Sequence, residues 1–315
     1  MRRVLITGLT GFAGSHLAEL LVNLGGYAVF GTIFGETKVV TGLPKEQAIK
    51  LDLRDKEATL RVVKEVDPEW IFHLAALTSP AQSFADPTGV ITNNIEAQIN
   101  LLEAARKLTG IKKILVVGSA EEYGKVSLSG LPINENVPLK PLNPYAVSKI
   151  SQDFLGLQYY LSYKLPVVRV RPFNHTGERQ PPLFVVPAFA KQIAEIEAGL
   201  LEPVVKVGNL EAIRDFTDVK DMVRAYVLAV EKGEEGEVYN LGSGRGVKIR
   251  QVLGELLALA KKPIRVEQDP ARLMPVDVPQ LVGDSRKFYN LTGWQPQIAF
   301  RETLARVLDY WRSKI

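Results

Sequence analysis

The N-terminal stretch reads Val4-Leu5-Ile6-Thr7-Gly8-Leu9-Thr10-Gly11-Phe12-Ala13-Gly14, a short apolar run followed by three evenly spaced glycines. Glycines permit a tight turn and let backbone N–H groups approach a pyrophosphate, and a helix that starts there adds partial positive charge. The spacing is G-x-x-G-x-x-G rather than the commoner G-x-G-x-x-G. A glycine-rich turn that binds nothing would look similar, but the position after a strand favours a dinucleotide site. We predict that its contacts are Gly8, Thr10, Gly11, Phe12, Ala13 and Gly14.

The first 170 residues alternate short β-branched runs with longer helical stretches. We expect strands at residues 4–7, 28–33, 49–51, 70–74, 114–117 and 167–170, and helices at 15–24, 56–66, 95–108 and 145–161. Strands that alternate with helices imply right-handed βαβ units. The sequence therefore predicts an α/β protein with a doubly wound parallel sheet of the Rossmann type.

The composition of the sequence changes after residue 172, where prolines become frequent. We expect helices at 189–198, 218–231, 249–259 and 300–311 and a short strand at 238–241. Residues 1–172, with returns at about 208–245, are predicted to form the dinucleotide-binding domain. Residues of about 173–207 and 246–315 are predicted to form a smaller α/β lobe that binds the substrate.

Composition excludes several classes of protein. Cysteine is absent from the 315 residues, which rules out disulfides, thiolate metal sites and a cysteine nucleophile, and three scattered histidines do not suggest a metal site. Lys+Arg 39 against Asp+Glu 35 gives +4 without a basic run, so we expect no nucleic-acid partner. No stretch reaches the roughly 20 apolar residues of a membrane span, and no signal peptide is visible. We expect a cytoplasmic location.

A candidate catalytic pair lies in Tyr145-Ala146-Val147-Ser148-Lys149, where a phenol and an ammonium are four residues apart on one helical face. A neighbouring Lys is expected to lower the pKa of the Tyr toward working pH. The pattern alone is weak, since Tyr160 and Lys164 repeat it without a partner motif. Ser119 follows an expected strand, where active-site residues of open parallel sheets collect.

Further cofactor contacts are predicted at the ends of the next strands. The second strand, which contains Thr32, ends without the acidic residue that commonly selects NAD, so NADP is favoured and NAD stays possible. Asp52 and Leu53 follow the third strand, at a position that faces adenine. Leu74, Ala75 and Ala76 follow the fourth strand with side chains that let the cofactor pass closely.

Taken together, residues 7–14, Ser119, Tyr145 and Lys149 resemble an extended short-chain dehydrogenase/reductase. Six segments narrow the resemblance to bacterial GDP-sugar enzymes, the GDP-4-keto-6-deoxy-mannose reductases and GDP-mannose 4,6-dehydratases. These segments are residues 118–124, 171–177, 208–210, 214–218, 275–279 and 292–296. One departure is Met274, where these relatives commonly have an arginine.

The resemblance implies roles for individual residues. Tyr145 and Lys149 would form the acid/base pair, Lys149 would also contact the nicotinamide ribose, and Ser119 would orient the 4-oxygen of the sugar. The cofactor would be lined by residues 74–78, which include Thr78, and by His175. The nucleotide diphosphate would meet Asn174, Lys191, Arg214 and Arg272, and the hexose would meet Ser83. Relatives commonly form homodimers through the helices at 95–108 and at Tyr145.

The resemblance leaves the reaction open among three alternatives. A 4,6-dehydratase needs a second base, and Glu121 stands where that base is usual, but Ala120 cannot supply the neighbouring acid. A 4-keto reductase needs only Ser119, Tyr145, Lys149 and a hydride from NADPH, and the segments at 171–177 and 214–218 favour it. An NAD-dependent C4 epimerase of nucleotide sugars is the third alternative. A non-catalytic dinucleotide sensor would not need the intact Ser, Tyr and Lys.

Overall fold

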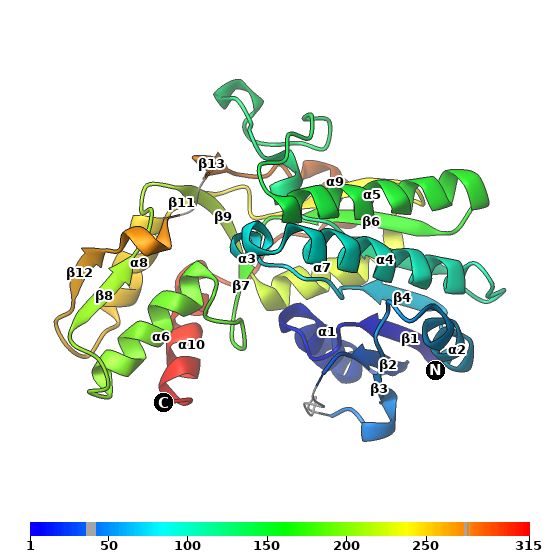
Figure 1. The fold of residues 1–315 in the computed structure, drawn as a ribbon, viewed down its shortest axis with the longest axis horizontal. Helices are drawn as coiled ribbons and strands as arrows, with labels where there is room; N and C mark the ends of the chain where they lie inside the picture. Colours follow the sequence, from blue (N-terminus) through cyan, green and yellow to red (C-terminus); the bar gives the residue numbers. More distant parts are fainter. Residues whose placement is uncertain (36–41, 274–275, 277) are drawn as a thin grey trace.

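The computed structural model describes residues 1–35, 42–273, 276 and 278–315, so Met274 lies outside the described residues. Within them, seven parallel strands form one sheet in the order β10-β6-β5-β4-β1-β2-β3 (Figure 1). The strands are β1 (Arg2–Thr7), β2 (Tyr27–Ile33), β3 (Ala48–Lys50), β4 (Trp70–His73), β5 (Lys113–Val117), β6 (Val167–Pro172) and β10 (Val238–Leu241). From β1 the chain builds the sheet first toward β3 and then toward β6, which confirms the predicted doubly wound parallel sheet.

Helices cover both faces of this sheet. One face carries α2 (Lys56–Val66), α4 (Pro87–Ala105) and α5 (Pro144–Tyr163), and the other carries α1 (Phe12–Leu24), α7 (Val219–Lys232) and α9 (Arg286–Thr292). Because side chains alternate along a strand, Val4 and Ile6 enter the core beneath α1 and α7, whereas Leu5 enters the core beneath α2 and α4. The short helix α3 (Pro80–Ala85) packs beside α5.

Helix α4 begins eight residues earlier than the sequence pattern indicated. Its start is fixed by Asp86, whose Oδ1 accepts the Gly89 N–H at 2.8 Å, and by Pro87 in the first turn. The prediction of a start at residue 95 was wrong because the polar run Thr92-Asn93-Asn94 hides the apolar period. Asn94 is buried inside the protein, where its side chain is fully hydrogen-bonded, so a polar residue there does not mark a surface.

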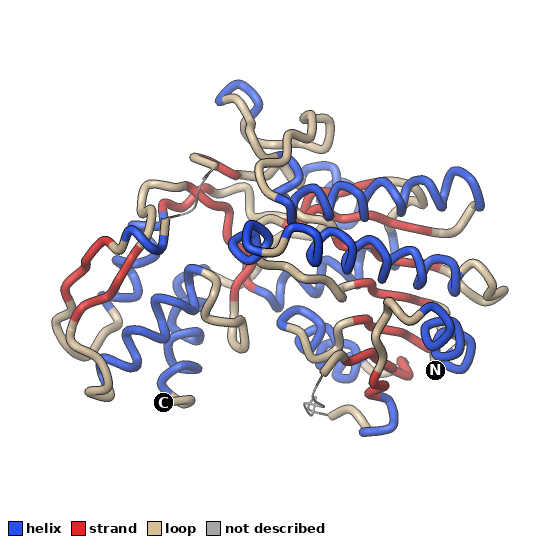
Figure 2. The backbone as a smooth tube through the Cα atoms, in the orientation of Figure 1, coloured by secondary structure: helices blue, strands red, loops and turns tan. Residues whose placement is uncertain are grey.

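A smaller lobe is built from the C-terminal half of the chain (left in Figure 2). It contains α6 (Val185–Glu197), α8 (Ile249–Ala258) and α10 (Phe300–Arg312), together with β8 (Val204–Val207) and β12 (Arg265–Gln268), which pair in parallel. These elements enclose their own hydrophobic core, to which Ile193, Val205, Leu253, Leu304 and Val307 contribute.

Short strands lie between the main sheet and this lobe (Figure 1). They are β7 (Asn174–Thr176), β9 (Ile213–Asp218), β11 (Gly246–Lys248) and β13 (Gln280–Leu281), and β9 pairs with each of the other three. Strand β9 leads directly into α7, which packs on the main sheet. Single turns of 3₁₀ helix complete the fold: η1 (Lys45–Gln47), η2 (Ala120–Tyr123), η3 (Leu128–Gly130) and η4 (Pro270–Arg272). None of the described helices is long and apolar enough to cross a membrane.

The end of β4 carries a buried imidazole whose titration is linked to folding. Burial lowers the pKa of His73 from its ordinary value of 6.5 to about 3. Between these values the unfolded chain binds a proton that the folded protein does not bind, so the free energy of unfolding falls as the pH drops, by about 1.4 kcal/mol per pH unit.

We predict that His73→Asn, which can keep the contact to Thr7, removes this part of the acid sensitivity. Urea unfolding of both proteins at pH 7 and pH 5 measures the effect. The loss of stability between the two pH values should be smaller in the variant by about 1–2 kcal/mol. An equal loss in the two proteins would show that His73 does not stay neutral in the folded state.

Candidate active site

The glycine-rich loop between β1 and α1 has no room for side chains at two of its glycines. Gly8 has a φ of +74°, and a Cβ there would lie 3.1 Å from the Ala75 backbone. A Cβ on Gly14 would lie 2.2 Å from the Gly8 carbonyl oxygen. Gly11 caps α1 without any side-chain hydrogen bond, so no capping side chain uses the amides of the first turn. The geometry of the loop therefore leaves room for the predicted pyrophosphate, whose contacts stay a prediction.

The neighbouring strand ends hold this loop in place. Thr7 Oγ1 accepts the N–H groups of Leu74 and Ala75, each at 3.1 Å, and lies 2.8 Å from His73 Nδ1. Thr32 accepts the Leu9 N–H through its backbone at 2.9 Å. Thr7 and His73 were missed by the sequence analysis. The only signal available was that polar residues end two buried strands.

Strand β7 brings His175 to the start of α1. Its imidazole stacks on the Phe12 ring with centroids 5.8 Å apart and planes 9° apart. Burial lowers the pKa of His175, which therefore stays neutral near pH 7. The structure thus brings His175 to the dinucleotide loop, while Thr10, Gly11, Phe12 and Ala13 keep part of their surface accessible.

Asp52 and Leu53 follow β3, as expected, and differ in their surroundings. Leu53 is buried, whereas the Asp52 carboxylate is held by the guanidinium of Arg54 through N···O distances of 2.7–3.2 Å. This hydrogen bonding lowers the pKa of Asp52. Ala76 and Thr78 lie in the segment after β4, where Thr78 is exposed.

The three predicted catalytic residues meet at the carboxyl end of β5. Ser119 opens η2, and its side chain lies close enough to the Tyr145 phenol to act on the pKa of that group. Tyr145 lies in the first turn of α5, where Asn143 Oδ1 caps the helix by accepting the Ala146 N–H at 2.7 Å. One turn later, Lys149 Nζ donates to the Val117 carbonyl and to Gln152 Oε1, each at 2.8 Å. The second Tyr/Lys pair ends the same helix, where Lys164 is exposed.

Burial governs the titration of this site. It raises the pKa of Tyr145 above the ordinary value of 10, and it lowers the pKa of Lys149 to about 8. The expectation that Lys149 lowers the pKa of Tyr145 is therefore wrong in this structure. The cause is that removal of the phenol from water is the largest effect on its pKa, and Glu121 raises that pKa further.

Glu121 lies in η2, the turn that follows Ser119. Its Oε2 accepts a hydrogen bond from Asn143 Nδ2 at 3.1 Å, and its charge acts on Tyr145. The next residue, Glu122, was missed by the sequence analysis. It is fully buried, and its Oε1 accepts the Ser119 N–H at 2.7 Å.

The lobe contains a cavity of about 710 Å³ that is lined by two of the predicted cationic residues, Lys191 and Arg272. Lys191 also forms an ion pair with Glu195, and Arg272 lies 3.5 Å from Asp269. Between the lobe and the sheet, Asn174 Oδ1 is buried and has no hydrogen-bond partner among the residues that the structure describes. A buried acceptor without a partner marks a position where a ligand group can donate.

Two other predicted substrate contacts, Arg214 and Ser83, donate hydrogen bonds to backbone carbonyl groups of the protein itself. Arg214 in β9 donates to the carbonyl groups of Ile213 and Val278. Ser83 in α3 is fully buried, and its hydroxyl donates to the Pro80 carbonyl at 2.7 Å. The structure therefore does not support the predicted contact of Ser83 with a hexose, because the helix itself uses its hydroxyl.

The fold and the Ser-Tyr-Lys arrangement define an extended short-chain dehydrogenase/reductase. The model of a family described as GDP-mannose 4,6 dehydratase matches residues 5–307. The GDP-6-deoxy-D-mannose reductase of Pseudomonas aeruginosa is 33% identical over 314 residues, which cover 100% of this chain and 98% of that protein. This chain belongs to the GDP-mannose 4,6-dehydratase family.

Two solved structures match the whole fold. One is RMD from Pseudomonas aeruginosa in complex with NADPH, with a TM-score of 0.87 and 32% identity, covering 100% of both chains. The other is UDP-glucose 4-epimerase from Thermus thermophilus in complex with NAD, with a TM-score of 0.88 and 32% identity, covering 99% of this chain and 100% of that one. Similarity to solved structures alone therefore does not select among reduction, dehydration and epimerisation.

The close approach at Gly14 generates a prediction about dinucleotide binding. Gly14→Ala forces the loop away from the Gly8 carbonyl, so the affinity for NADPH should fall at least about tenfold, a modest estimate for a displaced backbone site. Gly254→Ala is the matched control, because a Cβ there, in helix α8, meets no atom within 4 Å. Titration of NADPH fluorescence measures both variants. Unchanged affinity in folded Gly14→Ala protein would remove this loop from the cofactor site.

Proposed function

We propose that this protein reduces the 4-keto group of a nucleotide-bound 4-keto-6-deoxy sugar of the GDP-4-keto-6-deoxy-mannose type. The observation that carries the proposal is that Ser119, the buried Tyr145 phenol and Lys149 meet at the carboxyl end of β5, where Lys149 Nζ donates to the Val117 carbonyl at 2.8 Å. NADPH, when bound, supplies the hydride, and NAD(H) is the alternative cofactor. Residues of the loop, the segment after β4 and His175 would hold it.

The chain's own residues can perform the remaining steps. Tyr145 donates its phenolic proton to the 4-oxygen as the carbonyl is reduced, and Ser119 donates a hydrogen bond to the same oxygen. Lys149, whose pKa is about 8, carries a positive charge at pH 7 that stabilises the phenolate left behind. Its hydrogen bonds to Val117 and Gln152 fix the position of that charge.

The raised pKa of Tyr145 suits the phenol to act as the acid of a reduction. A reductase needs the phenol as an acid in its first step, and a pKa raised by burial keeps the phenol protonated. A 4,6-dehydratase or a C4 epimerase must first remove a proton from the 4-hydroxyl, which needs the phenolate. The 33% identity to a GDP-6-deoxy-D-mannose reductase over the full chain also supports the proposal.

GDP-mannose 4,6-dehydration is the second candidate, and one observation favours it. Glu121 lies close enough to Tyr145 for its charge to act on the phenol, a suitable place for a second base. Against it, Glu121 accepts a hydrogen bond from Asn143, and Ala120 is an apolar neighbour that is buried.

The lobe supports a nucleotide diphosphate as the carrier of the sugar. The cavity of about 710 Å³ is large enough for a nucleotide, and Lys191 and Arg272 place two cations on its wall. Arginine in particular suits a diphosphate through charge and through its planar set of donors. We propose that the lobe of residues 173–207 and 246–315 binds the nucleotide, while Asn174 donates or accepts at its inner end.

The test follows NADPH absorbance in the presence of GDP-4-keto-6-deoxy-mannose and, separately, GDP-mannose. The proposal predicts stoichiometric loss of NADPH with the keto sugar and no reaction with GDP-mannose. Tyr145→Phe should lower kcat at least about 100-fold, the contribution of a general acid, and should leave NADPH affinity unchanged. Dehydration of GDP-mannose by the wild-type protein would replace the proposal with the second candidate, and unchanged turnover in Tyr145→Phe would refute the catalytic assignment.

We also propose that the protein is a homodimer. Val147, Phe154 and Leu161 recur every seven residues on α5 and are 40%, 52% and 59% exposed. Helix α5 packs against α4, and the apolar stripe is exposed on this helix pair. A stripe with a heptad period suits packing against the same helix of a second copy around a two-fold axis.

We predict that Phe154→Glu converts the dimer into a monomer, because two unpaired carboxylates would be buried at the interface. Leu128→Glu is the control, since Leu128 is 82% exposed on η3, away from α5. Sedimentation velocity measures the mass of both variants and of the wild type. A monomeric wild type, or a dimeric Phe154→Glu variant, would contradict the proposed interface.

A further inference from the structure

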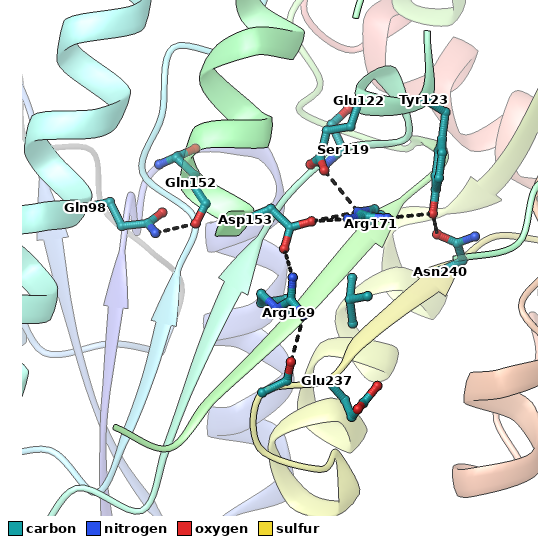
Figure 3. A network of polar contacts seen from close by, with 12 residues as sticks. Gln98, Ser119, Glu122, Tyr123, Gln152, Asp153, Arg169, Arg171, Glu237 and Asn240 are labelled. Atoms are coloured by element: carbon teal, nitrogen blue, oxygen red, sulfur yellow. Dashed lines mark hydrogen bonds and ion pairs between the residues drawn. The ribbon is translucent and has the colours of Figure 1, made fainter. Parts of the chain in front are cut away.

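Next to Ser119 lies a group of buried ionisable side chains that pair with one another and that the proposed reaction does not use (Figure 3). Arg171 lies 3.0 Å from Glu122 through Nε and Oε2, and it pairs with Asp153 at 2.5 Å. Asp153 in turn accepts from Arg169 through its other oxygen. All four side chains are buried, with at most 6% of each residue exposed. Burial of four ionisable side chains is costly, so their arrangement requires an explanation beyond stability.

One oxygen of this group contacts the backbone of the candidate active site. Glu122 Oε1 accepts the N–H of Ser119 at 2.7 Å, while Oε2 faces Arg171. Ser119 Oγ in turn accepts the Glu121 N–H at 3.2 Å, which completes a capping box at the start of η2. Glu122 thus links the buried ion pairs to Ser119, the residue whose side chain lies next to the Tyr145 phenol.

Gly118 supplies an independent observation. A Cβ at this position would lie 2.3 Å from Glu122 Oε1 and 3.1 Å from the Val170 carbonyl oxygen. The glycine does not have a positive φ, so backbone conformation does not require it. What requires it is the space that the Glu122 carboxyl group occupies against the chain. The sequence Gly118-Ser119 therefore accommodates this side chain directly before the serine.

The far side of the group is equally fixed. Arg171 Nη1 donates to the Tyr123 hydroxyl at 3.1 Å, and that hydroxyl donates to Asn240 Oδ1 at 2.7 Å. Asp153 holds Arg171 from α5, four residues after Lys149. The carboxyl group of Glu122 is therefore held by Arg171 from β6, and Arg171 is held in turn by Asp153 from α5 and through Tyr123 by Asn240 of β10.

We propose that Glu122 is a positioning residue. It fixes the backbone of Ser119, so that the serine hydroxyl is held next to the Tyr145 phenol and next to the 4-oxygen of a bound substrate. Arg171 and Asp153 fix Glu122 in turn. The activity readout of this inference rests on the proposed 4-keto reduction, but the structural readout does not. A displacement of about 1 Å at a catalytic group can lower the rate about 100-fold. Loss of the backbone hydrogen bond that holds Ser119 can therefore lower kcat strongly.

We expect the length of the Glu122 side chain, which brings its oxygen to the Ser119 N–H, to position Ser119. The charge of the carboxyl group is not needed for this. Burial, with Asp153 nearby, raises the pKa of Glu122 well above its ordinary value, so a neutral acceptor of the same length should serve. The charged and titratable groups facing Glu122 are Asp153 and Lys149 from α5, Tyr145 from the same helix, and Arg171 from β6.

Three substitutions separate reach from charge in the NADPH-loaded protein. Glu122→Gln keeps the length and an oxygen acceptor, and should retain at least about a third of wild-type kcat. Glu122→Asp keeps the charge but is shorter by one C–C bond, about 1.5 Å, and should lose at least about tenfold in kcat, as should Glu122→Ala. KM and NADPH affinity should stay within about twofold, because no contact to either ligand is lost. If Glu122→Asp keeps its kcat and Glu122→Gln loses it, charge is what matters and the proposal is wrong.

Two further variants separate positioning from general stability. Tyr123→Phe removes the adjacent hydrogen bond to Arg171 without contact to Ser119, and its kcat should stay within about twofold of wild type. Gly118→Ala should lower kcat at least about tenfold in the wild type, but should cost little more in Glu122→Ala, where the displaced carboxyl group is gone. A kcat loss in Tyr123→Phe equal to that in Glu122→Ala would indicate a merely structural role.

Amide hydrogen exchange at Ser119 tests the same inference without any substrate. Exchange should be faster in Glu122→Ala and Glu122→Asp than in the wild type, and nearly unchanged in Glu122→Gln. If the protein fails to reduce the keto sugar while this exchange pattern holds, the proposed function fails and the positioning role stands. Equal exchange in all four proteins overturns the positioning role whatever the reaction is.

Discussion

Removal of the carboxyl end of β5 from water is the constraint on which the rest of the site depends. A buried polar group without a partner costs more than any single hydrogen bond gains, so each group there must be paired. Lys149 is paired with the Val117 carbonyl and with Gln152, and Gln152 in turn donates to the Asn94 carbonyl at 2.9 Å. Asn94 then donates to Ser148 at 2.9 Å. The polar residues inside α4 and α5 are thus explained by one chain of contacts that begins at the catalytic lysine.

The same burial gives the site its chemical bias. A phenol that water does not reach holds its proton, and an ammonium in the same place loses its proton more easily. Tyr145 and Lys149 show these two shifts in opposite directions. A site of this kind is ready to donate a proton to a carbonyl oxygen, which is the first requirement of a reduction. Gly8 brings the dinucleotide loop against the turn after β4, and Gly14 lets α1 start close to Gly8.

Much of the main sheet could be predicted from the sequence because its strands are buried on both faces and read as β-branched runs. The lobe was less accessible to prediction. Strand β12 is exposed along its whole length, and β7 and β11 have three residues each, so none has a hydrophobic period. The start of α4 was missed because buried asparagines interrupt its apolar face, although Asp86 and Pro87 carry an ordinary capping signal.

For the site, local patterns were visible and distant pairings were not. The glycine loop and the Tyr/Lys pair lie within short segments, and the structure brings both to the same edge of the sheet. Glu122, Arg171 and Asp153 come from three elements, and Tyr123 contacts Asn240 across 117 positions, so no local pattern could join them. The direction of the Tyr145 pKa was wrong because burial cannot be read from a spacing of four residues.

The most direct measurement is the ionisation of Tyr145, followed by ultraviolet absorbance as the difference between the wild-type protein and Tyr145→Phe. The account predicts that the difference spectrum shows no phenolate until the pH exceeds the ordinary tyrosine value of about 10. Phenolate that forms near neutral pH would contradict it, because the site would then favour a base that removes a proton from a hydroxyl over an acid that completes a reduction.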